Sequence, residues 1–174
     1  LSGLFNFILG QGVGLFRTAT GWSGNLNNLY NGDGYWLNAN VANPSFQWGS
    51  GCETALPVAR ITQETPEEYQ FIQSTEQAFY FIEDIRFDDG SSIENGDIVL
   101  AYNDNVLVGA REWSGKFTDI PAMGSDGSFS TIGYCNINSS PEFKVIKNST
   151  GEEYVLDVDT PEWSSNEIFQ LGIL

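Results

Sequence analysis

The 174-residue chain contains no histidine and only 7 lysine and arginine residues. Without histidine, the usual general base of Ser-His-Asp and Cys-His catalysis is missing, and most transition-metal sites lose their commonest ligand. A serine-lysine nucleophile would need Lys116, Lys144 or Lys147, and none of these stands near a serine in a strained nucleophile turn. The sequence therefore argues against a nucleophilic enzyme.

Basic residues are so scarce that the net charge is −16, although only 17% of the residues are charged. Such an acidic surface repels phosphate backbones, so we expect no nucleic-acid partner. No apolar run is long enough to span a bilayer, so we expect no membrane insertion. A polar surface with few bases is common in secreted proteins of salty habitats, and it favours an extracellular protein over an acidic cytosolic one.

Cysteine is also rare, with only Cys52 and Cys135 present. In an oxidising compartment the two could form a disulfide, and the alternative is two separate buried thiols. They do not form a zinc motif, because such sites need clustered Cys and His. The chain opens without Met and inside an expected strand, so we expect a processed or excised piece of a longer polypeptide.

The residues that are present favour many short strands. Hydrophobic residues make up 41% of the chain and aromatic residues 14%, while 19 glycines supply turns. In "QSTEQAFYFIEDIRF" a helix is the alternative, but Phe79, Phe81, Ile85 and Phe87 alternate, which favours a strand. The stretch "NGDIVLAYNDNVLVGAREWSG" reads as a hairpin. We therefore predict an all-β protein with an antiparallel β-sandwich.

An internal repeat divides the predicted sandwich into two related hairpin-containing halves. Shifted by 91 residues, "ILGQGVGLFRTATGWSGNLNNL" lies over "VLAYNDNVLVGAREWSGKFTDI", so that Trp22 meets Trp113. Further on, Tyr35 meets Tyr134. The alternative is chance recurrence of strand and turn residues. The predicted organisation is a first, truncated β-unit at 1–60, a linker at 61–69 and a second β-unit at 70–174.

The charged pair at the end of the second hairpin has no counterpart in the first half. Arg111 and Glu112 align with Thr20 and Gly21, so their charges are not part of the shared unit. We expect Arg111 to pair with a nearby carboxylate, and we expect Trp113 to anchor its loop onto the sheet.

Several short motifs in the second half resemble a known kind of module. They are "QSTEQAFYFIEDI", the hairpin above, "DIPAMGSDG", "TIGYC" and "PEFKV". Together they resemble a module repeated in large secreted or surface-attached bacterial proteins, with similar sequences in viral structural proteins. The resemblance covers about residues 70–147. It implies a β-rich, extracellular, structural or adhesive part without a catalytic motif.

Aromatic and acidic residues supply two candidate binding sites. Exposed Tyr35, Trp36 and Trp48 could serve as platforms for sugar rings in an Asn-rich region. The loop "DDGSSIENGD" offers oxygen ligands that calcium accepts, but without EF-hand spacing, and ordinary solvated turns are the alternative. Its candidate ligands are Asp88, Asp89, Glu94 and Asp97.

A glycosidase needs only two carboxylates at a set separation. The candidates nearest aromatic residues are Glu76, Glu83 and Glu112, but acidic residues are frequent throughout this chain. The leading hypothesis is a non-catalytic structural or adhesive module of an extracellular, cell-surface or virion assembly, without an obligatory cofactor. Its partners would be further copies of itself or other subunits. A carbohydrate-binding module is the alternative, and a carboxylate glycosidase is a third hypothesis.

Overall fold

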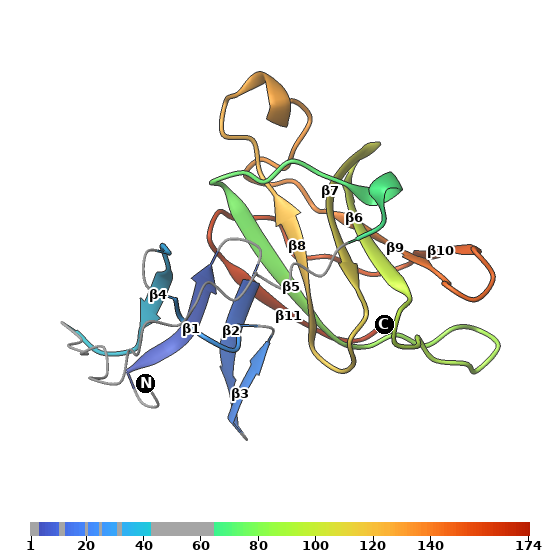
Figure 1. Ribbon diagram of the computed structural model, residues 1–174, viewed down its shortest axis with the longest axis horizontal. Coiled ribbons are helices and arrows are strands. Elements are labelled where there is room, and N and C mark those ends of the chain that lie inside the picture. Colours follow the sequence, from blue (N-terminus) through green and yellow to red (C-terminus); the bar gives the residue numbers. More distant parts are fainter. Residues whose placement is uncertain (1–3, 11–12, 20, 25, 31–32, 43–64) are drawn as a thin grey trace.

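The computed structural model describes residues 4–10, 13–19, 21–24, 26–30, 33–42 and 65–174. The described residues form strands and two short 3₁₀ helices, with no α-helix among them (Figure 1). In chain order the elements are β1 Phe5–Gly10, β2 Val13–Thr18, β3 Gly21–Gly24, β4 Trp36–Ala39, η1 Glu67–Tyr69, β5 Gln77–Asp84, β6 Ile98–Asn103, β7 Val106–Glu112, β8 Thr118–Met123, η2 Phe129–Thr131, β9 Glu142–Ile146, β10 Glu153–Leu156 and β11 Ile168–Ile173. The all-β prediction is confirmed.

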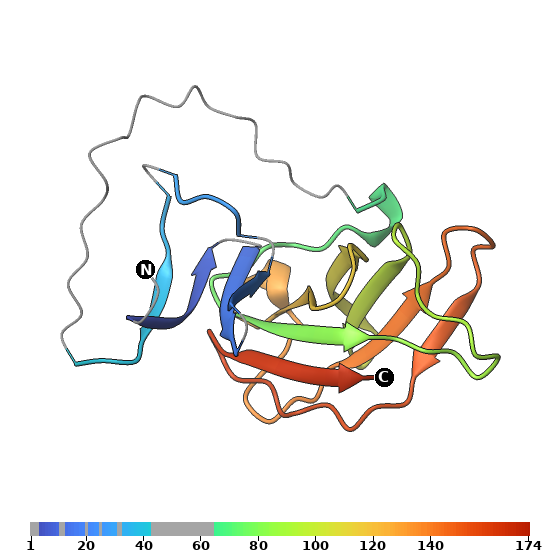
Figure 2. The same cartoon turned by 90° about the horizontal axis from the view of Figure 1, so that it is seen from below.

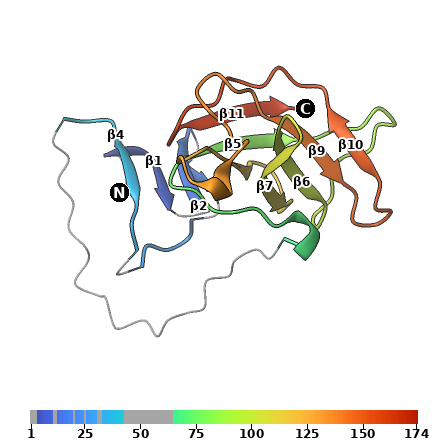
Figure 3. The same ribbon diagram turned by 90° about the horizontal axis from the view of Figure 1, so that it is seen from above.

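The described strands form three sheets, with the orders β3-β2-β1-β4, β11-β5-β8 and β10-β9-β6-β7. We call the first the N-terminal sheet, and the other two together the sandwich. In the view from above, the N-terminal sheet lies at one end of the molecule and β10 at the other (Figure 3). Neighbouring strands are antiparallel, as predicted, with one exception.

The exception is β11, which runs parallel to β5, with Ile168 opposite Phe79 and Leu171 opposite Ile82 (Figure 2). A parallel neighbour needs a crossover instead of a tight turn. Here the long connection from β10 supplies it, and Trp163 holds that connection in place by donating its indole Nε1–H to the Ala122 carbonyl at 2.9 Å.

The core of the sandwich lies between its two sheets. Ala78, Tyr80 and Ile82 of β5 face inward and belong to one buried cluster with Val99 of β6 and Phe143 of β9. The ring of Tyr80 stands edge-on to Phe143 at a centroid separation of 5.3 Å. Inward-facing residues alternate along β5, as expected of a strand.

The opposite face of β5 is buried as well. Phe79 and Phe81 form a second cluster with Leu9 of β1 and Phe16 of β2, and the rings of Phe16 and Phe81 are 4.3 Å apart. The predicted strand is therefore confirmed, but burial is not limited to the odd-numbered residues. The N-terminal sheet covers the outer face of β5, so this strand has apolar residues in both registers.

The edges of the two sandwich sheets meet where β7 passes β8. Gly109 lies against the Pro121 carbonyl, in a space where a Cβ atom would clash. Two residues further along β7, Arg111 donates from Nε to the Asp119 carbonyl and from Nη2 to the Asp119 carboxylate, both at 2.9 Å. This buried ion pair confirms the expected partner type of Arg111. Trp113 is 3% exposed within the core, which agrees with its predicted anchoring role.

The predicted linker is described only in part. Residues 61–64 lie outside the described residues, and Glu67–Tyr69 form η1. Tyr69 and Phe71 pack against the outer face of β6 beside Leu100 and Ile146. The segment directly before β5 therefore covers the sandwich, and the division into two units stays a prediction.

Candidate functional site

A loop between β8 and β9 projects from the sandwich, and we call residues 124–137 the apical loop (orange, top of Figure 1). Its two ends are held together by backbone hydrogen bonds. Ser125 N donates to Cys135 O at 2.9 Å, and Cys135 N donates to Met123 O at 3.2 Å. The loop thus leaves and rejoins the sandwich at one closed base.

The tip of the loop, residues 126–132, is organised around the Asp126 carboxylate. Its Oδ1 accepts a hydrogen bond from the Thr131 hydroxyl at 2.7 Å and another from Ser128 N at 3.0 Å. Hydrogen bonds from the side chains of Ser128 and Thr131 lower the pKa of Asp126 to about 2. The carboxylate therefore stays ionised at neutral pH and keeps these bonds, which hold η2 in place.

Three large apolar side chains of the apical loop face solvent. Phe129 is 95% exposed, Ile137 is 76% exposed and Ile132 is 68% exposed. Residues 127–141 carry no charged side chain, whereas the whole chain has 23 acidic residues. The loop therefore presents three exposed apolar side chains and the exposed carboxylate of Asp126 from a hydrogen-bonded base, and exposed apolar side chains are common at interaction sites.

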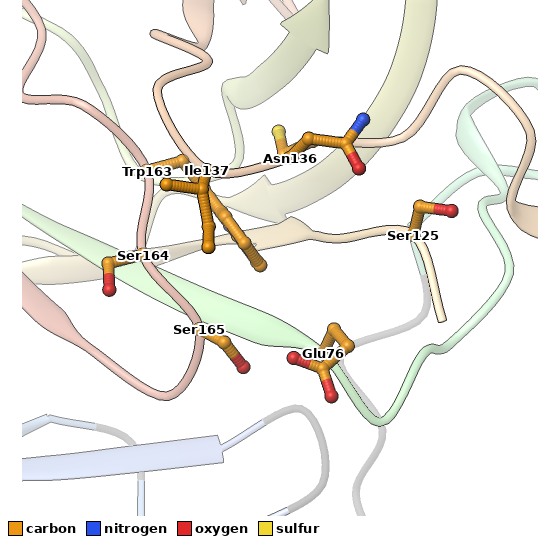
Figure 4. A pocket seen from close by; sticks show the side chains of 8 residues that line it. Glu76, Ser125, Asn136, Ile137, Trp163, Ser164 and Ser165 are labelled. Atoms are coloured by element: carbon orange, nitrogen blue, oxygen red, sulfur yellow. The ribbon is translucent and has the colours of Figure 1, made fainter. Parts of the chain in front are cut away.

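A recess of about 300 Å³ lies at the base of the apical loop (Figure 4). Four separate segments supply its walls: the residue before β5, both ends of the apical loop and the connection before β11. The described lining residues are Glu76, Ser125, Cys135, Asn136, Ile137, Trp163, Ser164 and Ser165. The recess therefore combines hydroxyl and amide groups with apolar side chains.

Trp163 fixes the shape of the recess. It is 4% exposed, and its ring packs against Gly124, where any Cβ atom would collide with it. Its backbone N donates to Ser139 O at 2.6 Å. Because its ring packs against Gly124 and its indole Nε1–H is bonded to the Ala122 carbonyl, Trp163 forms a fixed wall of the recess.

The recess offers a single carboxylate among its described lining residues. Glu76 is half-buried, and Figure 4 shows the Ser165 hydroxyl pointing toward it. Acid-base glycoside hydrolysis needs a second carboxyl group roughly 5 to 9.5 Å away. Glu83 stands at the far end of β5, about 23 Å away along an extended strand. Glu112 is exposed at the end of β7. Of the three predicted glycosidase residues, Glu76 is the one among the described lining residues of this recess.

The residues predicted to bind sugars are only partly described. Trp48 lies outside the described residues. Trp36 is 42% exposed on β4. Tyr35 is half-buried, and its hydroxyl accepts from Tyr30 N at 2.9 Å and contacts the Asp33 carboxylate at 3.3 Å. Of this set, Trp36 is the described side chain with an open face, and sugar binding stays a prediction.

The predicted calcium ligands do not form a cluster. Asp88, Asp89 and Glu94 are exposed, and Asp89 Oδ1 accepts from Ser91 N at 2.8 Å. Asp97 is buried, and its two oxygens accept from Glu94 N and from Asn148 N, each at 2.9 Å. Within the described part of the chain, no three acidic or cysteine side chains come close enough to hold a metal ion. Asp97 instead joins two loops, and calcium binding stays a prediction.

The predicted disulfide also involves an undescribed residue. Cys135 is a free, buried cysteine at the base of the apical loop, and burial raises the pKa of its thiol to about 12. Cys52 lies outside the described residues. The pairing of the two cysteines therefore stays a prediction.

Sequence reasoning did not identify the apical loop or the recess as a site. The sequence did contain a signal for an exposed apolar loop. Phe129 and Ile132 stand in an uncharged run rich in Gly and Ser, and the run lacks the alternating apolar residues that would form the buried face of a strand. The recess carries no comparable signal, because its walls come from segments far apart in the sequence.

Comparisons with protein-family models, curated proteins and solved structures find no match for this chain. The resemblance to modules of secreted and surface proteins therefore stays an expectation. No helix in the described residues combines the length and the apolar character needed to cross a bilayer.

Proposed function

We propose that this chain is a non-catalytic structural or adhesive β-module of an extracellular, cell-surface or virion assembly. The observation that carries the proposal is the apical loop, which holds Phe129, Ile132 and Ile137 in solvent from a hydrogen-bonded base. Exposed apolar side chains that gather on a protein surface mark sites that bind other molecules, and these three belong to one loop.

The internal order of the loop favours binding. Thr131 is 1% exposed, and its hydroxyl bonds to Asp126 hold the tip in one conformation. A surface that is already ordered loses less conformational entropy when it binds. The apical loop therefore has the properties of a preformed contact and not of a loose connection.

The charge distribution also favours an association surface at this place. The chain carries a net charge of −16, while residues 127–141 carry none. A partner that covers residues 127–141 desolvates no charged side chain on them, and Asp126 is the one charged group of the apical loop. The acidic side chains that follow residue 52 keep the module soluble, and an extracellular location is part of the proposal.

The relation between the two halves belongs to the same proposal. Each half has a hairpin, β1–β2 or β6–β7, followed by a Trp-Ser-Gly triplet. Under the 91-residue shift, the start of β2 at Val13 would fall on Asp104, whereas β7 starts at Val106. The two halves would thus share an order of motifs, with a different strand register in each hairpin.

The proposal is tested by coating beads with the full chain. Beads that cluster with one another, or that stay on lipid-coated or polysaccharide-coated glass under flow, reveal adhesion. We expect attachment that the double variant Phe129→Ser/Ile132→Ser abolishes. Val155→Ser is the matched control, because Val155 is 65% exposed on the distant strand β10. Equal attachment by the double variant and the wild type would refute a role of the apical loop.

A further inference from the structure

We propose that two copies of this chain associate by reciprocal insertion, with Phe129 of each copy entering the recess of the other. The inference rests on the proposed function and names the partner of the apical loop. It joins the side chain that is 95% exposed with the recess of about 300 Å³ beneath the same loop.

The first argument is self-complementarity. A two-fold contact places the same patch of both copies together, so that patch must carry both a protrusion and a hollow. The apical loop carries both, because Phe129 projects from its tip while Ser125, Asn136 and Ile137 at its base line the recess. A two-fold rotation axis between the two copies would therefore generate two identical contacts, each between the Phe129 of one copy and the recess of the other.

The second argument is charge. Two copies with a net charge of −16 repel each other wherever their acidic surfaces meet. Residues 127–141 carry no charge, and the nearest acids in the contact are Asp126 and Glu76. The apical loop thus offers two copies a contact with few acidic side chains, a property that it shares with residues 1–52, where Arg17 and Asp33 are the charged residues.

The third argument is the chemistry of the recess. Ile137 and Trp163 give an entering phenyl ring an apolar wall, and Trp163 is held so that the wall does not close. The serine hydroxyls at the opposite side keep contact with water at the edge of the recess. An aromatic side chain in a preformed, partly apolar pocket is the usual centre of a protein interface.

A lipid surface is the main competitor for the same apolar tip. Loops that insert into cell membranes commonly add basic side chains that attract anionic headgroups. The apical loop and the described lining of the recess contain no Lys or Arg. The observations therefore favour a second copy over a bilayer.

Sedimentation velocity of the full chain over a concentration series tests the inference. We expect a reversible monomer-dimer equilibrium that tightens as salt rises, because salt screens the repulsion between the acidic copies. Phe129→Ser removes the protrusion and should raise the dissociation constant at least about tenfold. Val155→Ser, an exposed apolar residue on β10, should leave the constant unchanged.

A second variant fills the hollow. Ser165→Trp places a large ring in the recess and should weaken dimerisation as much as Phe129→Ser, with an unchanged melting temperature as the check on folding. Phe129→Ser keeps its recess, and Ser165→Trp keeps its protrusion. An equimolar mixture of the two variants regains one of the two contacts, so it should dimerise more tightly than either variant alone.

Three results would overturn the inference. They are a wild type that stays monomeric at its highest soluble concentration, dimerisation unaffected by Phe129→Ser, and mixed variants that associate no better than each alone. Flotation with phosphatidylcholine vesicles distinguishes lipid binding from dimerisation. Lipid binding that depends on Phe129, in a protein that forms no dimers, would also overturn the inference. In each case bead retention on other surfaces still decides the proposed adhesive function independently.

Discussion

The N-terminal sheet and the sandwich are both β-sheet structures, yet they bury their residues differently. The sandwich encloses its own core, with Tyr80, Phe143 and Val145 fully buried between two sheets. In the N-terminal sheet, Leu9 and Phe16 are buried against Phe79 and Phe81, which belong to β5 of the sandwich. Strand β5 of the sandwich therefore supplies part of the core of the N-terminal sheet.

The polar contacts of the two regions differ in the same direction. The sandwich has buried ties, such as Arg111 to Asp119 and Trp163 to the Ala122 carbonyl. In the N-terminal sheet the described bond between the side chains of Asn6 and Asn38 is exposed. Exposed bonds and a smaller buried cluster predict that the N-terminal sheet opens at a lower free energy than the sandwich.

The largest effect on stability is expected from Tyr80→Ala, which disrupts the core of the sandwich. The variant removes a ring that contacts Phe143 and Phe169 and leaves a cavity in the core. We expect it to lower the free energy of unfolding by about 3 to 5 kcal/mol, as measured in urea. Because the N-terminal sheet packs on β5, unfolding of the sandwich should also remove the support of that sheet.

Tyr154→Ala provides the matched control for that substitution. Tyr154 stands on the edge strand β10 and contacts Phe87, with its hydroxyl bonded to Glu152 at the surface. Its truncation should cost roughly 1 kcal/mol or less. Equal losses at the two tyrosines would contradict a core centred on β5.

The second largest effect is expected from Phe16→Ala, which separates the two regions. The ring of Phe16 contacts both Phe81 and Phe117, so its loss removes the main link between the N-terminal sheet and the sandwich. We expect the free energy of opening of β1–β4 to fall by roughly 2 to 4 kcal/mol, as measured by amide hydrogen exchange. Protection in β6 and β9 should stay close to that of the wild type.

Arg17→Ala is the control for Phe16→Ala. Arg17 is the next residue of β2 and is exposed, so its side chain lies on the other face of the strand. Its removal should leave exchange in β1–β4 almost unchanged. Uniform loss of protection throughout the chain in Phe16→Ala would mean that the two regions unfold together.

A smaller, pH-dependent effect is expected at Asp119. In the β5–β8 register Asp119 is opposite Phe81, so it lies on the face that the N-terminal sheet covers. Burial raises the pKa of Asp119 to about 6, although Arg111 opposes this shift. The folded state therefore binds a proton that the open state binds less readily. This proton binding stabilises the folded state at low pH, and the stabilisation is lost as the pH rises toward about 6.

The free energy of opening of β1–β4 should accordingly fall between about pH 4 and pH 6. Asp119→Asn has no carboxyl to titrate, so its profile over the same range should be flatter. Hydrogen exchange corrected for its intrinsic pH dependence measures both proteins. A slope that is the same in the variant would place the titrating group elsewhere.

The sandwich was easier to predict from sequence than the N-terminal sheet. Phe79 and Phe81 alternate, and the turn in "LAYNDNVLV" lies between two apolar runs, so β5, β6 and β7 follow from local patterns. Arg111, one of the few bases, found the expected carboxylate partner because a buried charge must be paired.

Features that depend on distant segments were not predicted. The burial of β5 on both faces requires knowing that β1 and β2 pack on it, and the parallel direction of β11 depends on a long connection. The recess draws on four segments, among them Glu76 and Trp163, which are far apart in sequence. Local periodicity reports the direction of side chains but not which segments meet.

The smallest effect is expected from Trp36→Ala, and it sharpens the comparison within the N-terminal sheet itself. Trp36 pairs with Leu9 across the β1–β4 ladder, but it is 42% exposed, whereas Phe16 is 2% exposed. If the sandwich supplies the stability of this sheet, an edge residue that does not touch it matters little. Trp36→Ala should change the opening free energy of β1–β4 by about 0.5 to 1 kcal/mol, well below the loss for Phe16→Ala. A loss as large as that for Phe16→Ala would show that the sheet has a core of its own.

The same variant tests the glycan hypothesis, because loss of polysaccharide binding without loss of protection would assign Trp36 to a ligand.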